Sequence, residues 1–382
     1  MRPLDSKLPK VGTTIFTVMS QLAAQHQAVN LSQGFPDFLP PAGLLEIVQR
    51  CVGERYHQYA PMPGSLALRE AIAGKLAQLY GTAADPGAEI TITSGATEAI
   101  FDAIAAVVRR DDEVIVFDPC YDSYEPSITL AGGRTVHLPL VLPDFAIDWE
   151  RLHASLSART RLVIVNSPHN PSGALLGSAD FERLAELLRP YDCYVLSDEV
   201  YEHVVFDGAR HTTVLANAEL AAKSFAVFSF GKTYHATGWK LGYCVAPPAL
   251  SAELRRVHQY VTFSSTTPLQ QALAEYLTAH PEHHVNLPAF YQERRDYFAG
   301  LLAATKFRAR RAPGTYFQLA DYSAISSLPD VEFARWLTVE HGVAVIPVSV
   351  FYEQPPEIRL VRFCFAKENA TLDAAAARLR RL

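Results

Sequence analysis

The stretch SFGKTYHATGWKLGY, from Ser229 to Tyr243, decides how the chain can fold and act. It places the tripeptide GKT directly after the apolar run FAVFSF, as a nucleotide-binding P-loop does. A P-loop needs G-x-x-x-x-G-K-[ST], because glycines at both ends let backbone N–H groups wrap the phosphates. Ala226 stands where the first glycine should be, and apolar residues fill the loop. This argues against a P-loop and leaves Lys232 as either a surface lysine or a covalent catalyst.

The residues around this stretch predict an α/β fold. Short apolar runs rich in Val, Ile and Phe, without alternation, are typical of strands buried on both faces of a sheet. Helical patterns such as ATEAIFDAIAAVVRR (96–110) lie between them, and such alternation predicts a mostly parallel sheet. The runs are EITIT (89–93), EVIVF (113–117), RLVIVN (161–166), CYVLSD (193–198) and FAVFSF (225–230).

The last hundred residues predict a smaller α+β domain. Helical patterns at 288–305, 331–341 and 371–382 alternate with the strand-like pieces YFQLADY, VAVIP and EIRLVRFCFA. The first forty residues, with the irregular stretch GFPDFLPP, are expected to join this domain. We therefore expect a large domain over 45–288 and a small domain made of 1–44 and 289–382.

Composition excludes several classes of partner. A net charge of −6 and a pI near 6.1 leave no basic field for nucleic acid. No apolar stretch reaches the roughly 18 to 20 residues of a membrane span, and the N-terminus has no signal-like apolar region. We expect a cytoplasmic protein that binds small molecules, with no membrane contact.

Cysteines and histidines predict no disulfide framework and no metal site. The five cysteines are scattered and never form a CxxC pair, so we expect free thiols. His258, His280, His283 and His284 lack metal-ligand spacing, and we expect them in solvent or at an interface.

The pattern Ser229-x-x-Lys232-x-x-x-x-x-Gly238-x-Lys240-x-Gly242 resembles the fold-type-I, class I/II aminotransferases, which depend on pyridoxal 5′-phosphate. The resemblance implies a large domain with a mostly parallel seven-stranded sheet between helices, a smaller α+β domain, and a homodimer with shared active sites. Many members carry arginine where this chain has Lys240, and lysine there is shared by the kynurenine, glutamine and methionine transaminase branch. Within that branch the chain is most similar to bacterial methionine aminotransferases.

The resemblance also implies which residues hold the cofactor ring. Lys232 would bind the cofactor covalently and serve as the catalytic base. Asp198, in SDEVYEH, would pair with the pyridinium nitrogen, although Ser-Asp-Glu alone also suits a helix N-cap. Tyr201 and Asn170 would hydrogen-bond the phenolic oxygen, and Tyr121, in DPCYDSYEP, would stack on the ring.

Further positions are implied for the phosphate. In TSGATEAI the chain turns from a strand into a helix, whose N-terminal amides and dipole favour an anion. Ser229 and Lys240 would add a hydroxyl and a cation, and Tyr59 would reach the phosphate in the neighbouring subunit. The residues at the turn are Gly95, Ala96 and Thr97.

The substrate pocket is implied by residues at both ends of the chain. Arg362, in RLVRFCFA, would grip the α-carboxylate with its planar fork, and Gly34 would lie against the substrate. Phe16, Phe35 and Phe263 predict an apolar pocket, which suits methionine, phenylalanine, histidine or kynurenine as amino donor. A cysteine-conjugate C–S β-lyase would use the same cofactor residues and stays an alternative. A regulatory pyridoxal-phosphate module is disfavoured, because no basic helical DNA-binding segment is present.

Overall fold

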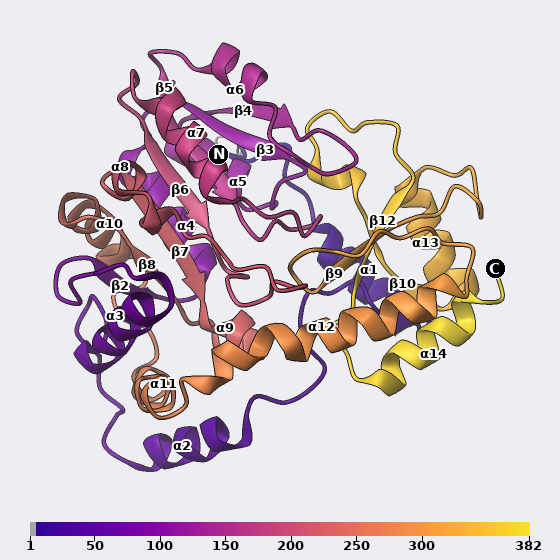
Figure 1. Cartoon of the computed structure of the whole chain (residues 1–382), viewed down its shortest axis with the longest axis horizontal. Coiled ribbons are helices and arrows are strands. Elements are labelled where there is room, and N and C mark those ends of the chain that lie inside the picture. Colours follow the sequence, from indigo (N-terminus) through magenta and orange to yellow (C-terminus); the bar gives the residue numbers. More distant parts are fainter. Residues whose placement is uncertain (1–4) are drawn as a thin grey trace.

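The largest sheet of the molecule has seven strands, in the order β2-β8-β7-β6-β5-β3-β4 (Figure 1). The computed structural model describes residues 5–382. β8 is antiparallel to its neighbours β2 and β7, and all other neighbouring pairs are parallel. This confirms the mostly parallel seven-stranded sheet. The strands are β2 (Ile90–Thr93), β3 (Glu113–Asp118), β4 (Arg134–Pro139), β5 (Thr160–Asn166), β6 (Tyr194–Asp198), β7 (Ser224–Ser229) and β8 (Gly242–Val245).

Alternate residues of these strands pack into two different cores. Ile115 faces one core and its neighbours Val114 and Val116 face the other, so both faces of the strand are buried. This two-sided burial explains why the strands read as continuous apolar runs. One face carries α4 (Ala96–Val107), α5 (Tyr124–Ala131) and α10 (Pro248–Val261). The other carries α3 (Leu66–Tyr80), α6 (Trp149–Ser155) and α7 (Ser178–Leu188). On this side α11 (Thr267–Ala279) packs against α3, and α2 (Ala42–Gly53) packs against α11.

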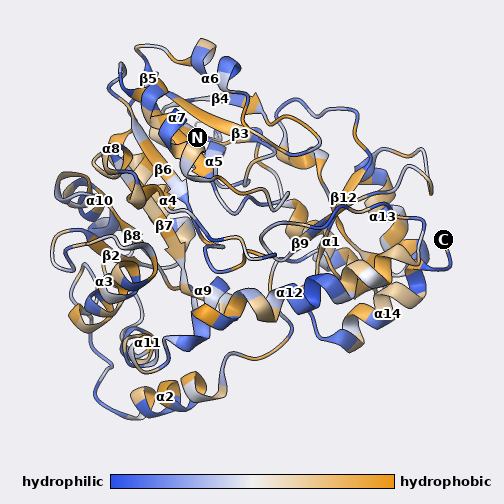
Figure 2. Cartoon of the chain, in the orientation of Figure 1, coloured by the Kyte–Doolittle hydropathy of each residue, from blue (hydrophilic) through white to orange (hydrophobic). Residues whose placement is uncertain are grey.

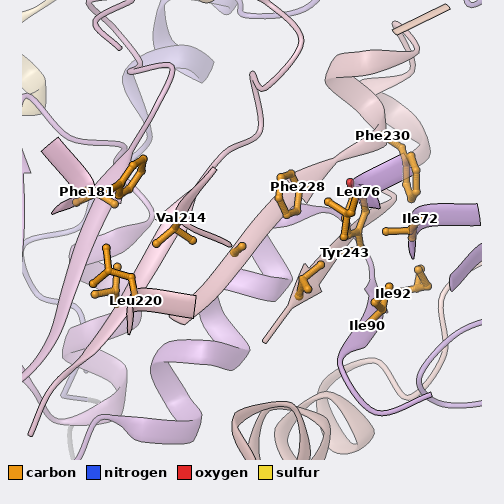
Figure 3. Packing of buried hydrophobic residues seen from close by; sticks show 14 of the residues in the cluster. Ile72, Leu76, Ile90, Ile92, Phe181, Val214, Leu220, Phe228, Phe230 and Tyr243 are labelled. Carbon is orange, nitrogen blue, oxygen red and sulfur yellow. The ribbon is translucent and has the colours of Figure 1, made fainter. Parts of the chain in front are cut away.

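The core on the α3 side is built from aromatic and branched side chains (Figure 3). Phe228 of β7 stacks on Tyr243 of β8 with ring centroids 4.9 Å apart. Ile72 and Leu76 of α3, both fully buried, belong to the same core. Burying each such side chain contributes roughly 1.5 to 3 kcal/mol, which stabilises the part of the sheet formed by β2, β8 and β7.

The N-terminal segment packs with the C-terminal region. β1 (Val29–Asn30) pairs in parallel with β10 (Val343–Ala344). A second small sheet has the antiparallel order β11-β12-β9. Met19 and Leu31 share a core with this region. Its elements are α1 (Ile15–Gln25), α12 (Glu282–Ala303), β9 (Phe317–Asp321), α13 (Asp330–His341), β11 (Ile346–Pro347), β12 (Leu360–Cys364) and α14 (Asn369–Leu379).

The run VAVIP does not form the single strand that was predicted. It divides into β10 and β11, because the chain leaves β1 after two residues and joins β12 instead. The expected domain boundaries, at 44/45 and 288/289, fall inside α2 and α12 and remain predictions, and residues 1–4 of the first segment lie outside the described range. Figure 1 shows α12 extending from the neighbourhood of the large sheet to α14.

The remaining elements are short. They are the helices α8 (Ala218–Ala221) and α9 (Phe230–Thr233) and the 3₁₀ helices Val214–Ala216, Thr237–Trp239 and Ser349–Phe351. Apolar residues concentrate in the strands and polar ones on the outward helix faces (Figure 2). Within residues 5–382, no helix combines the length and apolarity that crossing a membrane requires. All five cysteines are free thiols, as predicted.

The prediction for the histidines was wrong at two positions. His258 is fully buried and His284 is 3% exposed. His258 lies on α10 against two carboxylates of α4, which compensate the burial of its ring. His284 belongs to the first turn of α12 rather than to a loop, and its ring stacks on that of His203 at 5.2 Å.

Candidate active site

A cavity of about 240 Å³ opens at the carboxyl edge of the large sheet. β2, β3, β5, β6 and β7 run in the same direction, so their carboxyl ends meet at this edge, where open α/β sheets bind their ligands. The cavity brings together most of the predicted site residues from five strand ends and from both ends of the chain. They are Phe16, Gly34, Gly95, Ala96, Thr97, Tyr121, Asn170, Asp198, Tyr201, Ser229, Lys232, Lys240 and Arg362.

Lys232 projects into the cavity from α9, the single turn that follows β7. Its Nζ donates a hydrogen bond to the carbonyl of Gly34 at 3.1 Å and lies 5.5 Å from the ring centre of Tyr201. Burial lowers the pKa of Lys232 to about 8, and the nearby cationic Arg362 and Lys240 act in the same direction. The lysine is therefore placed and tuned as a reactive amine rather than as a surface charge.

Asp198 ends β6 and is 3% exposed. The hydroxyl of Tyr124 donates to its Oδ2 at 2.6 Å, while its Oδ1 receives only a long contact of 3.4 Å from the backbone N–H of Val200. Burial raises the pKa of this carboxyl to about 6, against the lowering effect of the Tyr124 hydrogen bond. Asp198 thus keeps one oxygen available to pair with a cation in the cavity. It does not cap a helix, because the residues after β6 form turns.

Asn166, at the end of β5, fixes the loop that carries Asn170. Its Nδ2 donates to the carbonyl of Asp198 at 2.8 Å, and its Oδ1 accepts from the backbone N–H of Asn170 at 2.8 Å. One side chain therefore sets the spacing between the ends of two neighbouring strands. In turn, Oδ1 of Asn170 accepts a hydrogen bond from Nη1 of Arg362 at 2.8 Å.

Arg362, on β12, is 1% exposed and held on three sides. Nη2 donates to the carbonyl of Ser32 at 3.0 Å, and the guanidinium lies 3.9 Å from the ring centre of Phe317. Among the described residues its Nε has no hydrogen-bond partner. A buried guanidinium with spare donor capacity is suited to bind a carboxylate. The ring of Phe16, 5.2 Å away, makes the surroundings apolar.

The β2 end of the cavity is shaped by glycines. Gly95, at φ 82°, caps α4, and a Cβ there would lie 3.2 Å from Nζ of Lys240. At Gly242 a Cβ would lie 2.7 Å from the backbone nitrogen of Ala96. Only residues without a side chain let the start of α4, Lys240 and the β7–β8 pair approach this closely. The first amides of α4 and the ammonium of Lys240 therefore face one another.

Three predicted residues lie outside this cavity. Phe35 is 41% exposed, and its ring lies 4.8 Å from Nζ of Lys367. Tyr59 is 82% exposed and packs edge-on against Phe263 with ring centroids 5.5 Å apart. The structure does not bring Phe35 to the substrate pocket, and the role of Tyr59 in a neighbouring subunit stays a prediction.

Sequence reasoning did not identify several residues that organise the site. Tyr124, Tyr316 and Phe317 act through contacts with residues far away in the sequence, and Asn166 combines one such contact, with Asp198, with a local one to Asn170. Tyr316 donates to the carbonyl of Gly34 at 2.6 Å, the same oxygen that accepts from Lys232. A polar residue ending an apolar strand, as Asn166 does, was the only local signal available.

The donor set fits pyridoxal 5′-phosphate. A reactive amine, an available carboxylate oxygen and a glycine-lined helix N-terminus with a cation surround one cavity. These are the groups that an aldehyde, a cationic ring nitrogen and a phosphate require. The fit rests on Asp198, Lys232 and Gly95, each from a different strand end.

Comparison with known proteins agrees with this chemistry. The family model described as aminotransferase class I and II matches residues 26–379. Methionine aminotransferase of Escherichia coli is 55% identical over 99% of this chain and 98% of its own length. Human kynurenine–oxoglutarate transaminase 1 is 32% identical over 94% of each chain. The crystal structure of YbdL from Escherichia coli, for which a methionine aminotransferase function was identified, superposes with a TM-score of 0.98 over the whole of both chains, at 54% identity.

Proposed function

The chain belongs to the class I and II aminotransferases, and we propose that it moves the amino group of an L-amino acid, methionine above all, to a 2-oxo acid. The observation that carries this proposal is Lys232, an amine of lowered pKa in one cavity with Asp198 and Arg362. The preference for methionine rests on the 55% identical relative and on the apolar rings of Phe16 and Phe317 beside Arg362. Aromatic amino acids, histidine and kynurenine are the competing donors.

We propose pyridoxal 5′-phosphate as the cofactor, which supplies an electron sink for the Cα of the amino acid. Asp198 would hold the ring nitrogen in its protonated form. Tyr201 and Asn170 would hydrogen-bond the ring oxygen, and Tyr121 would stack on the ring. The phosphate would be held by Ser229, Lys240 and the amides of Gly95, Ala96 and Thr97.

Lys232 would hold the cofactor covalently and act as the base for the Cα proton. At pH 7 a pKa of about 8 leaves about a tenth of the free amine neutral, against about 1 in 3,000 at the ordinary lysine value. Only the neutral amine can accept a proton, so burial raises the fraction of competent base several hundredfold. The carbonyl of Gly34 accepts from Nζ and keeps the amine at the cavity wall.

Arg362 would bind the substrate α-carboxylate and disfavour a substrate bound in another orientation. Asn170, Ser32 and Phe317 hold its guanidinium in a single orientation, so little side-chain entropy is lost on binding. This orientation would turn the Cα of the amino acid toward Lys232.

We also propose a cytoplasmic homodimer with shared sites. Tyr59 and Phe263 form an exposed aromatic pair away from the cavity of their own chain. A tyrosine that is 82% exposed is consistent with a position completed by a second subunit. Sedimentation of the purified protein would show whether it is a dimer.

An absorbance spectrum with and without methionine tests the proposed reaction. The purified protein should carry a visible band of bound cofactor that methionine bleaches and a 2-oxo acid restores. Lys232→Ala should bind the cofactor weakly and lose turnover by several orders of magnitude. Release of pyruvate and a thiol from a cysteine conjugate, without bleaching by methionine, would indicate a β-lyase instead. A protein that cannot be reconstituted with pyridoxal 5′-phosphate would refute the proposal.

A further inference from the structure

A buried histidine lies behind the helix N-terminus that faces the cavity. His258 of α10 is fully buried and contacts α4 directly. Its Nδ1 lies 2.9 Å from Oε1 of Glu98, and its Nε2 lies 3.0 Å from the carbonyl oxygen of Met62. A carbonyl can only accept, and a carboxylate can only accept, so both ring nitrogens carry hydrogens. The geometry therefore describes an imidazolium ion.

The two carboxylates that contact His258, Glu98 and Asp102, lie in the first turns of α4, where their negative charge disfavours binding of an anion. Glu98 is the third residue of α4, and its second oxygen accepts from the backbone N–H of Ser94, next to the cap residue Gly95. Asp102 lies one turn further and approaches His258 to 3.6 Å. Carboxylates in the first turns stabilise a helix, but they oppose a second anion at the same terminus. A phosphate at Gly95 would therefore meet the field of Glu98.

His258 is the counter-charge available for these carboxylates. Among residues 5–382 it is the only cationic group within 4.0 Å of either Glu98 or Asp102. Arg255, the neighbouring cation on α10, is engaged with Thr91 and with backbone carbonyls. The carboxylates of Asp102 and Glu98, which accept hydrogen bonds from the ring, raise the pKa of His258 to about 9 despite its burial, which agrees with the geometry.

We infer that His258 is a positioning residue for the cofactor phosphate: its imidazolium neutralises Glu98 and lets the start of α4 accept a dianion. The same ring fixes the turn at Ser94 through Glu98 and the segment before Pro63 through the Met62 carbonyl. This inference rests on the proposed function, because it assumes that the anion at Gly95 is the phosphate of pyridoxal 5′-phosphate.

Titration of the apoprotein with pyridoxal 5′-phosphate and with pyridoxal, which lacks the phosphate, tests the inference. It distinguishes an effect of charge on phosphate binding from a general change in the structure of the site. His258→Gln should weaken the affinity for pyridoxal 5′-phosphate by about 2- to 30-fold, the range of a charge at a helix terminus. The affinity for pyridoxal should stay unchanged. The double variant with Glu98→Gln should regain part of the lost affinity, because Glu98, the carboxylate nearer to Gly95, is gone and only Asp102, one turn further along α4, is left without its counter-charge.

The outcomes distinguish this inference from the proposed function. A wild-type protein that binds neither ligand would refute the function itself. Equal weakening of both ligands, or no rescue by Glu98→Gln, would make His258 a purely structural residue. If His258→Gln does not fold, Glu98→Gln alone decides: it should bind pyridoxal 5′-phosphate at least as tightly as wild type, and weaker binding overturns the inference. A stoichiometric metal that a chelator removes from wild type but not from His258→Gln would also overturn it.

Discussion

Replacing Arg362 by lysine tests the assignment of the carboxylate site most sharply. The substitution keeps the positive charge but removes the planar fork, whose nitrogens contact Asn170 at 2.8 Å and Ser32 at 3.0 Å. One ammonium cannot keep both contacts and also bind a carboxylate with two parallel hydrogen bonds. A hydrogen bond to a charged group contributes about 1.5 to 3 kcal/mol net. Losing one to the substrate, with the stacking on Phe317, should cost about 2 to 3 kcal/mol of transition-state binding.

That loss corresponds to a fall in kcat/KM for methionine of about 30- to 150-fold. Steady-state turnover measures it, and the absorbance of the bound cofactor serves as an internal control, because Arg362→Lys should leave cofactor occupancy unchanged. The matched control is Arg359→Lys, an exposed arginine three residues earlier, which should behave as wild type. A kcat/KM for Arg362→Lys within threefold of wild type would refute the role of this residue.

Three further changes have outcomes that the structure specifies. Tyr124→Phe removes a hydrogen bond to the ionised form of Asp198, so the pKa of that carboxyl should rise above about 6. The acidic limb of the pH profile of kcat/KM should then move to higher pH. An acidic limb that stays in place would contradict the role of this hydrogen bond. His258 has a folded pKa of about 9 against an ordinary 6.5, so its contribution to the free energy of unfolding, roughly 3 kcal/mol, should be complete below pH 6.5 and disappear as pH rises through 9. Denaturant unfolding of wild type, compared with His258→Gln between pH 6 and 10, should show that difference closing. Lys75 of α3 is buried and pairs with the buried carboxylate of Glu202, which also lies 3.3 Å from Nε2 of His203. Lys75→Met removes the ammonium partner of this carboxylate and should lower the free energy of unfolding by about 3 to 5 kcal/mol. A loss below about 1 kcal/mol in the same assay would show that the pair is not a stabilising contact.

The sequence by itself predicted the fold class and most of the residues that line the cavity. All five predicted strands of the large sheet are present, because two-sided burial leaves continuous apolar runs that can be read locally. Asp198 ends a strand, Lys232 and Asn170 follow strand ends, and parallel strands bring their carboxyl ends to one edge. The spacing around Lys232 was enough to reject a P-loop, because a missing glycine is visible without any tertiary information.

Only the tertiary structure decided which side chains hold those groups in place. Tyr124 meets Asp198 across 74 residues, and Tyr316 meets the carbonyl of Gly34 across 282 residues. No local pattern encodes such contacts, since they depend on how separate elements pack. His258 shows the same limit: its sequence surroundings predicted a ring in solvent or at an interface. The packing of α10 against α4 instead buries it beside two carboxylates. Local periodicity is set by the neighbours along the chain, whereas burial and charge pairing are set by neighbours in space.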